Sequence, residues 1–132
     1  MEIQFNKKHS CCIVGRTDIP PGYEPVLEYE FNNLIARGVT DFLFSGVGPF
    51  ERLCLETLQM LQQCYSYIPI RLILIGADAH WLANYEDDFD EILCLCRKSH
   101  PRLRPNRYTI CHSRFLFYFQ QTDFGGAFSD VR

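Results

Sequence analysis

The sequence has few of the features that would place the chain in a membrane or on nucleic acid. No run approaches the roughly 18 consecutive apolar residues that cross a bilayer. The amino-terminal segment carries an acid, Glu2, and lacks the apolar core of a signal peptide. The formal net charge of -3 offers no broad basic surface for nucleic acid. These absences predict a cytosolic, cytoplasmic protein whose partner is neither a membrane nor a nucleic acid.

A regular cysteine framework is also absent. The chain holds seven cysteines, an odd number, and most fall inside apolar runs, where a reduced thiol packs as a small hydrophobe. One residue separates Cys94 from Cys96, whereas zinc knuckles use two. We therefore expect no disulfide framework, no metal site and no cofactor.

The sequence does contain enough apolar residues for one core. At 132 residues and 47% hydrophobic content, it predicts a single domain over 1–132. The predicted strands are 11–14, 41–45, 70–75, 91–96 and 115–119. The predicted helices are 25–37, one that opens at Gly48-Pro49, a short one over 81–88, one over 105–112 and a last one after Gly126. Segment 91–96 can also be read as the end of the preceding helix, and we favour the strand.

This alternation of strands and helices predicts an α/β fold. We expect a single Rossmann-like three-layer sandwich, with about five parallel strands and helices on both faces. Ligands of such sheets bind beyond the carboxyl ends of the strands, where the strand order reverses. Glycines and cations occupy the predicted strand ends, which are Gly15-Arg16, Ser45-Gly46, Gly76-Ala77, Arg97-Lys98 and residues 123–126. This clustering is the main sign of a binding site.

The double glycine Gly125-Gly126 follows the last predicted strand. A turn of this kind lets backbone N–H groups approach a ligand and directs a helix amino terminus at it, which suits phosphate. The alternative is that the two glycines serve only a tight turn. The glycines at the two earlier strand ends favour the phosphate interpretation.

Several short motifs occur in a recognisable order. They are Gly15-Arg16, Ser45-Gly46, Glu51 with Glu56, Asp90-Glu91, Asn106-Arg107-Tyr108 and Gly125-Gly126. Together they resemble the SLOG superfamily, the Rossmann-like relatives of LOG phosphoribohydrolases, and within it a branch of small bacterial proteins that open with Gly-His-Arg. The resemblance implies the strand order 3-2-1-4-5, with the reversal between the strand ends at Gly15 and Cys96. The signature Pro-Gly-Gly-x-Gly-Thr-x-x-Glu of active LOG enzymes is missing, because no Glu follows Gly126.

The expected ligand set combines these strand ends with nearby charges. It comprises Gly15, Arg16, Ser45, Gly46, Glu51, Arg107, Gly125 and Gly126. Arg16 and Arg107 could each clamp a phosphate, or form surface salt bridges. Glu51 could accept a hydrogen bond from a ribose hydroxyl, or simply complement the dipole of its helix. Trp81 could stack on a base, or cover the edge of the sheet.

We therefore expect a binding module for a nucleotide or an ADP-ribose-like derivative, acting as a sensor or sequestering protein. One alternative is a hydrolase of a nucleotide N-glycosidic bond, with Glu51 and Glu56 as the catalytic carboxylates. These two lie about 140° apart around a helix, so they do not share a face. The other alternative is a protein-interaction fragment with a degenerate pocket. The sequence leaves the oligomeric state open, a homo-oligomer included.

Overall fold

A computed structural model of the chain describes residues 7–15, 22–95, 105, 115–119 and 126–130. A short 3-10 helix spans Lys7–His9. The α-helices are α1 (Glu24–Ala36), α2 (Pro49–Cys64) and α3 (Ala79–Ala83). The strands are β1 (Ser10–Gly15), β2 (Asp41–Phe44), β3 (Arg71–Gly76), β4 (Glu91–Cys94), β5 (Phe115–Phe119) and β6 (Gly126–Asp130). The α/β class with a parallel sheet is confirmed, and 91–94 is a strand.

The two long helices follow from their apolar spacing and their ends. The buried side chains of α1 recur at helical spacing and are Leu27, Phe31, Leu34 and Ile35. Proline stands in the first turn of both helices, where its missing N–H costs no hydrogen bond. Just past α1, Gly38 has a φ of +96°, a conformation that favours glycine and ends the helix.

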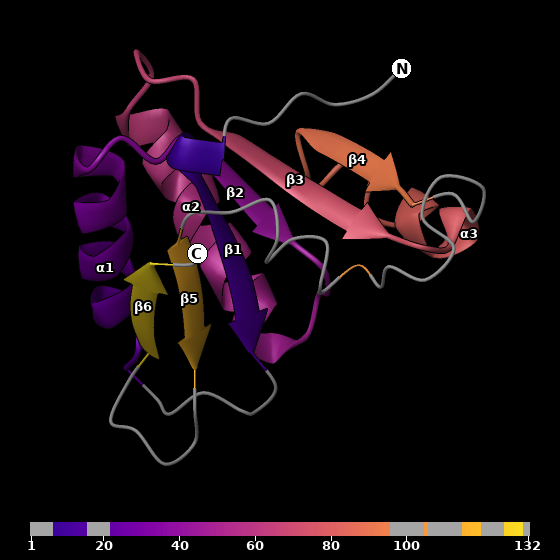
Figure 1. The fold of residues 1–132 in the computed structure, drawn as a ribbon, viewed down its shortest axis with the longest axis horizontal. Coiled ribbons are helices and arrows are strands. Elements are labelled where there is room, and N and C mark those ends of the chain that lie inside the picture. The colour runs from indigo at the N-terminus through magenta and orange to yellow at the C-terminus, as the bar shows by residue number, and fades with distance from the viewer. Residues whose placement is uncertain (1–6, 16–21, 96–104, 106–114, 120–125, 131–132) are drawn as a thin grey trace.

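The sheet has the order β4-β3-β2-β1-β5-β6 (Figure 1). The neighbours from β4 to β5 pair in parallel, and β6 pairs antiparallel with β5. The expected order 3-2-1-4-5 is wrong, because β4 pairs with β3 and β5 takes the place beside β1. Only the short helix α3 separates β3 from β4. With this short connection, β4 pairs with the free edge of β3. It does not cross over β2 and β1 to the other side of the sheet.

Helices α1 and α2 lie side by side against one face of the sheet (Figure 1). This placement follows from the direction in which the sheet grows. Each strand from β1 to β4 is added on the same side of the one before, and right-handed crossovers then put their helices on a single face. Cys11, Ile13 and Phe42 of the strands point into this helix-covered core. Phe42 meets Phe31 of α1 edge to face at 5.7 Å between ring centroids.

The opposite face of the sheet has its own buried cluster. Its members are Cys12, Leu43, Ile73, Ile75 and Leu95. Strand residues therefore alternate between two apolar faces, as in parallel sheets that are covered on both sides. The described part of the chain places no helix on this second face, so it provides two of the three expected layers. The predicted helix over 105–112 lies outside the described residues, apart from Pro105.

The end of the chain differs from the prediction. The helix expected after Gly126 is wrong, because β6 begins at that glycine and runs back along β5. Phe128 stands opposite Phe117 in the antiparallel register. Without β6, β5 would be an open edge of the sheet. A double glycine between apolar segments is typical of a hairpin as well as of a strand–helix turn.

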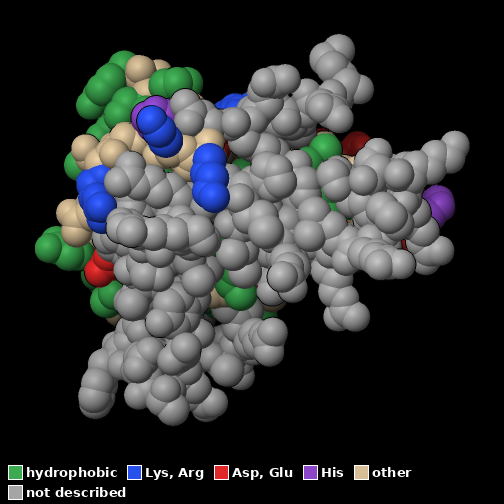
Figure 2. Space-filling model, in the orientation of Figure 1, with side chains coloured by type: hydrophobic (Ala, Val, Ile, Leu, Met, Phe, Trp, Pro, Cys, Tyr) green, Lys and Arg blue, Asp and Glu red, His purple; other side chains and the backbone are tan. Residues whose placement is uncertain are grey.

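Apolar side chains reach the surface on the side of the molecule where α1 lies (Figure 2). On α1 itself, Val26 and Tyr29 are 38% and 66% exposed. Among the described helices, none combines the length and the apolar character needed to cross a bilayer.

Candidate functional site

The carboxyl edge of the sheet brings several of the predicted site residues together. Gly15 at the end of β1 pairs with Phe119 of β5, and Phe119 pairs with Gly126. Ser45 and Gly46 follow the last residue of β2, which lies beside Ile13 of β1. The strand-end glycines of β1 and β2 and the first residue of β6 therefore share one edge. Arg16, Arg107 and Gly125 lie outside the described residues.

The reversal of strand order lies at a different place from the one expected. From β1 the sheet extends through β2 and β3 to β4 on one side, and through β5 to β6 on the other. The reversal is therefore between the ends of β1 and β5, at Gly15 and Phe119. The expectation that Cys96 flanks it is wrong, because the strand that precedes Cys96 stands at the far edge of the sheet.

A short glycine loop connects β2 to α2 at this edge. Gly48 is the N-cap of α2 in an extended conformation, Pro49 is the first helical residue, and Glu51 is the third. The Glu51 carboxylate folds back against the loop. A Cβ placed on Gly46 would lie 2.9 Å from Glu51 Oε2, and one on Gly48 would lie 3.3 Å from Oε1. Glycine at positions 46 and 48 thus leaves room for the Glu51 carboxylate, whereas a larger residue at either position would be in close contact with it.

The Glu51 carboxylate is poorly solvated. Burial raises its pKa above the ordinary value, and the backbone N–H groups of Glu51 and Gly48 offset only part of that rise. Its Oε1 atom is buried and accepts no hydrogen bond from the described residues. One turn further along α2, burial and the nearby Glu51 raise the pKa of the Cys54 thiol, which therefore stays protonated. This edge thus contains a buried acceptor oxygen with no donor among the described residues.

The second predicted carboxylate is not part of this arrangement. Glu56 is exposed on α2, whereas Glu51 is half-buried against the glycine loop. The two side chains leave the helix about 140° apart, as the spacing requires. Glu51 and Glu56 therefore do not form an acid–base pair in the described structure.

Trp81 covers the end of β3. Its ring packs on Tyr85, with 5.3 Å between centroids. A Cβ on Gly76 would lie 3.0 Å from Trp81 Cζ3 and 2.9 Å from Leu82 Cδ2. Gly76 is thus a packing glycine, and Trp81 packs over it at the end of β3.

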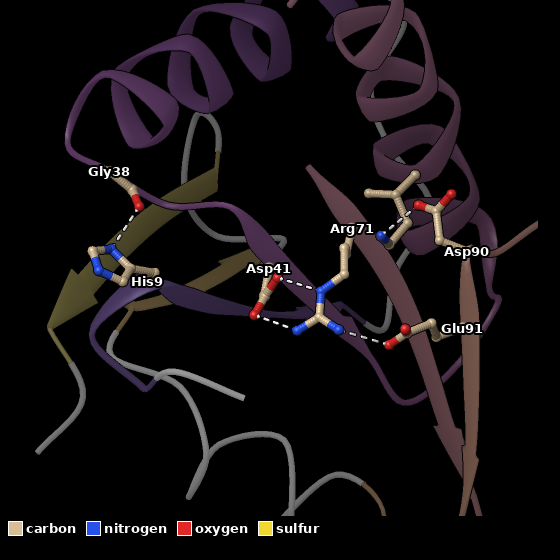
Figure 3. Close-up of polar contacts among 7 residues, drawn as sticks. His9, Gly38, Asp41, Arg71, Asp90 and Glu91 are labelled. Atoms are coloured by element: carbon tan, nitrogen blue, oxygen red, sulfur yellow. Dashed lines mark hydrogen bonds and ion pairs between the residues drawn. The ribbon is translucent and has the colours of Figure 1, made fainter. Parts of the chain in front are cut away.

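The amino edge of the sheet holds a charge cluster that the sequence analysis missed. Arg71 donates from Nε and Nη2 to the two carboxylate oxygens of Asp41, both at 2.9 Å, and from Nη1 to Glu91 Oε2 at 2.9 Å (Figure 3). Each of the three is the first residue of its strand. That shared position was the signal available in the sequence. The cluster aligns β2, β3 and β4 and lies at the edge opposite the glycine loop.

Asp90 belongs to the same edge. Its Oδ2 accepts hydrogen bonds from the Leu72 amide at 2.8 Å and from Gln62 Nε2 at 2.7 Å. His9 Nδ1 lies 2.9 Å from the Gly38 carbonyl oxygen, which ties the start of β1 to the end of α1. The Asp90-Glu91 motif therefore has a structural role in this fold.

Comparisons with known proteins add no family, relative or solved structure to these observations. No family model, no curated protein and no solved structure matches the chain. Within the described ranges, no three His, Cys, Asp or Glu side chains are grouped so as to hold a metal ion.

Proposed function

We propose that the chain binds a nucleotide or a nucleotide derivative, such as an ADP-ribose-like molecule, at the carboxyl edge of its sheet. The observation that carries the proposal is the reversal of strand order beside Gly15, in register with Phe119 and Gly126. Open α/β sheets bind their ligands in the crevice at this point. Glycine at both sides lets a ligand approach the backbone closely.

The proposed ligand residues divide by chemistry. Gly15, Gly126 and the preceding Gly125 would offer backbone N–H groups to phosphate. Arg16 and Arg107 would add charge-assisted hydrogen bonds to the same oxygens.

Ser45, Gly46 and Glu51 stand on the β2 side of that group and would face the sugar. This division agrees with the resemblance to the SLOG superfamily, which we retain as a proposal together with a cytosolic location and a sensor or sequestering role.

Binding without turnover is favoured over N-glycosidic hydrolysis by one observation. Hydrolysis needs positioned carboxylates near the ribose. Glu56 is exposed, and of these two carboxylates only Glu51 borders the glycine loop. The protein-interaction alternative is favoured by no comparable observation at this edge.

The first experiment is a thermal-shift screen of the purified chain against nucleoside monophosphates, NAD and ADP-ribose. A ligand at a hundred times its Kd should stabilise the fold by about 2.7 kcal/mol. Micromolar affinity, roughly 8 kcal/mol, is expected for the best ligand. A screen in which no nucleotide shifts the melting temperature would remove the proposal.

The second experiment replaces Arg16 with Ala and measures binding by calorimetry. The loss of a charge-assisted hydrogen bond should weaken nucleotide binding by about 1.5–3 kcal/mol and leave the melting temperature almost unchanged. Arg37→Ala is the matched control, because Arg37 is an exposed arginine just beyond α1. Equal loss in both variants, or unfolding of Arg16→Ala, would show that Arg16 is not a ligand residue.

Chromatography of the incubated nucleotides then separates binding from hydrolysis. The nucleotides should be recovered intact. Enzyme-dependent release of free base, abolished by Glu51→Gln or Glu56→Gln, would establish the hydrolase instead.

A further inference from the structure

The amino terminus of α2 opens at the carboxyl edge of the sheet, directly after the glycine loop 45–48. Helix amino termini attract anions through their N–H groups and their positive dipole end. In this chain a carboxylate of the protein itself already occupies the amino terminus of α2. The carboxylate of Glu51, in the first turn, folds back onto Gly46 and Gly48 and is held near the N–H groups of Gly48 and of Glu51 itself.

The contacts around Glu51 show how closely the carboxylate fits. Its Oε2 lies 2.9 Å from the position of a Cβ on Gly46, and its Oε1 lies 3.3 Å from that on Gly48. Any residue with a side chain at Gly46 would have to displace the carboxylate. Gly46 and Gly48 therefore border a space of about the size of one carboxylate group, and the Glu51 side chain of α2 fills it.

We propose that Glu51 determines specificity at this edge by excluding anions from the start of α2. A phosphate would have to displace the carboxylate from its N–H groups, and it would meet the negative charge of Glu51 at short range. A hydrogen-bond donor such as a sugar hydroxyl meets no repulsion and can pair with the carboxylate, whose Oε1 has no donor among the described residues. This inference rests on the proposed function, and it orients the ligand. The sugar faces loop 45–48, and the phosphates lie on the side of Gly15 and Gly126.

The test that is independent of any nucleotide uses sulfate as the probe. Sulfate binding to the wild-type chain, Glu51→Gln and Glu51→Ala is measured by thermal shift at pH 7.5 and constant ionic strength. Both variants should bind sulfate at least tenfold more tightly than the wild type. Glu56→Gln is the matched control, because it makes the same charge change on an exposed position of the same helix. It should leave the sulfate affinity within twofold of the wild-type value.

Three results would overturn the exclusion. The first is equal sulfate binding by the wild type and both Glu51 variants, and the second is an equal gain in Glu56→Gln, which would show a general effect of net charge. The third is failure of both Glu51 variants to fold, which would make the carboxylate a requirement of the fold and not of selectivity.

The orientation is tested with matched nucleotides, if the screen finds one that binds. Removing the 2′- or the 3′-hydroxyl should weaken binding to the wild type about tenfold and binding to Glu51→Ala less than twofold. Equal losses in both proteins would refute the contact with the sugar. If the nucleotide screen fails while the sulfate result holds, the proposed function is wrong and the exclusion of anions stands.

Discussion

The amino and carboxyl edges of the sheet differ in how fully their carboxylates are hydrogen-bonded. At the amino edge, the carboxylates of Asp41, Asp90 and Glu91 all accept hydrogen bonds from named donors. At the carboxyl edge, Glu51 keeps a buried oxygen without a donor among the described residues. Satisfying a buried polar group stabilises a fold, whereas leaving one unsatisfied costs free energy. The comparison indicates that the amino edge is built for stability, and that the carboxyl edge gives up stability where a ligand is proposed.

The largest effect should come from breaking the amino edge at Asp41. This side chain is 6% exposed and accepts both bonds of a bidentate pair with Arg71. We expect Asp41→Ala to lower the free energy of unfolding by about 2–3 kcal/mol, because it removes both bonds of the bidentate pair from a partly buried guanidinium. Urea denaturation measures this loss. A loss below about 0.5 kcal/mol would mean that the cluster does not hold the strands together.

The next effect compares two glycines of the carboxyl edge. Gly76→Ala places a methyl group against Leu82 and Trp81 at 2.9–3.0 Å, inside packed apolar contacts. We expect it to cost about 1–3 kcal/mol through overpacking. Gly46→Ala meets the end of the Glu51 side chain instead, which can swing away, so it should cost less. A larger drop in melting temperature for Gly46→Ala than for Gly76→Ala would contradict this. It would show that the Glu51 side chain cannot move away as easily as proposed.

A smaller effect should appear in the pH dependence of stability. Burial raises the pKa of Glu51 in the folded chain above its ordinary value of 4.5, so the ionised form destabilises the fold. Stability should therefore increase as the pH falls from neutral through the raised pKa toward 4.5. Glu51→Gln should be more stable than the wild type at pH 7–8, and this difference should shrink toward pH 4.5. Glu30, whose pKa burial also raises, titrates in both proteins and cancels in the difference.

The smallest effect is expected at the exposed partner of the amino-edge cluster. Glu91 is 36% exposed and makes one bond to Arg71. Glu91→Gln should cost less than about 1 kcal/mol, as exposed ion pairs do. The loss should shrink further in about 1 M salt, where exposed charges are screened. A loss equal to that of Asp41→Ala would show that both carboxylates contribute alike.

The sequence predicts local structure well where one element decides it. The spacing of Leu27, Phe31 and Leu34 defined α1, and Gly48-Pro49 defined the start of α2. The expectation that Gly15, at the end of β1, and Gly46, after β2, share one edge is also confirmed, because parallel strands end on the same side.

Features that depend on distant parts of the chain were not predictable in this way. The order of the strands depends on which strand pairs with the free side of β1. The apolar sequence of 115–119 does not specify that β1 is its partner. The tail 126–130 is a strand because β5 offers it an edge, and its own spacing is too short to distinguish a strand from a helix. The back-folded Glu51 was visible only as an acid in a first helical turn, and its fit against Gly46 required coordinates.

The position of β1 has a consequence for how the protein is made. Cys11 pairs with Phe42 on one side but with Phe115 on the other, more than a hundred positions later. During synthesis, β1 to β4 can assemble while one side of β1 still lacks its partner. Contacts between such distant segments form slowly, and an unpaired strand edge promotes aggregation until they do. A chain truncated before residue 115 should therefore expose the strand that stands at the centre of the finished sheet.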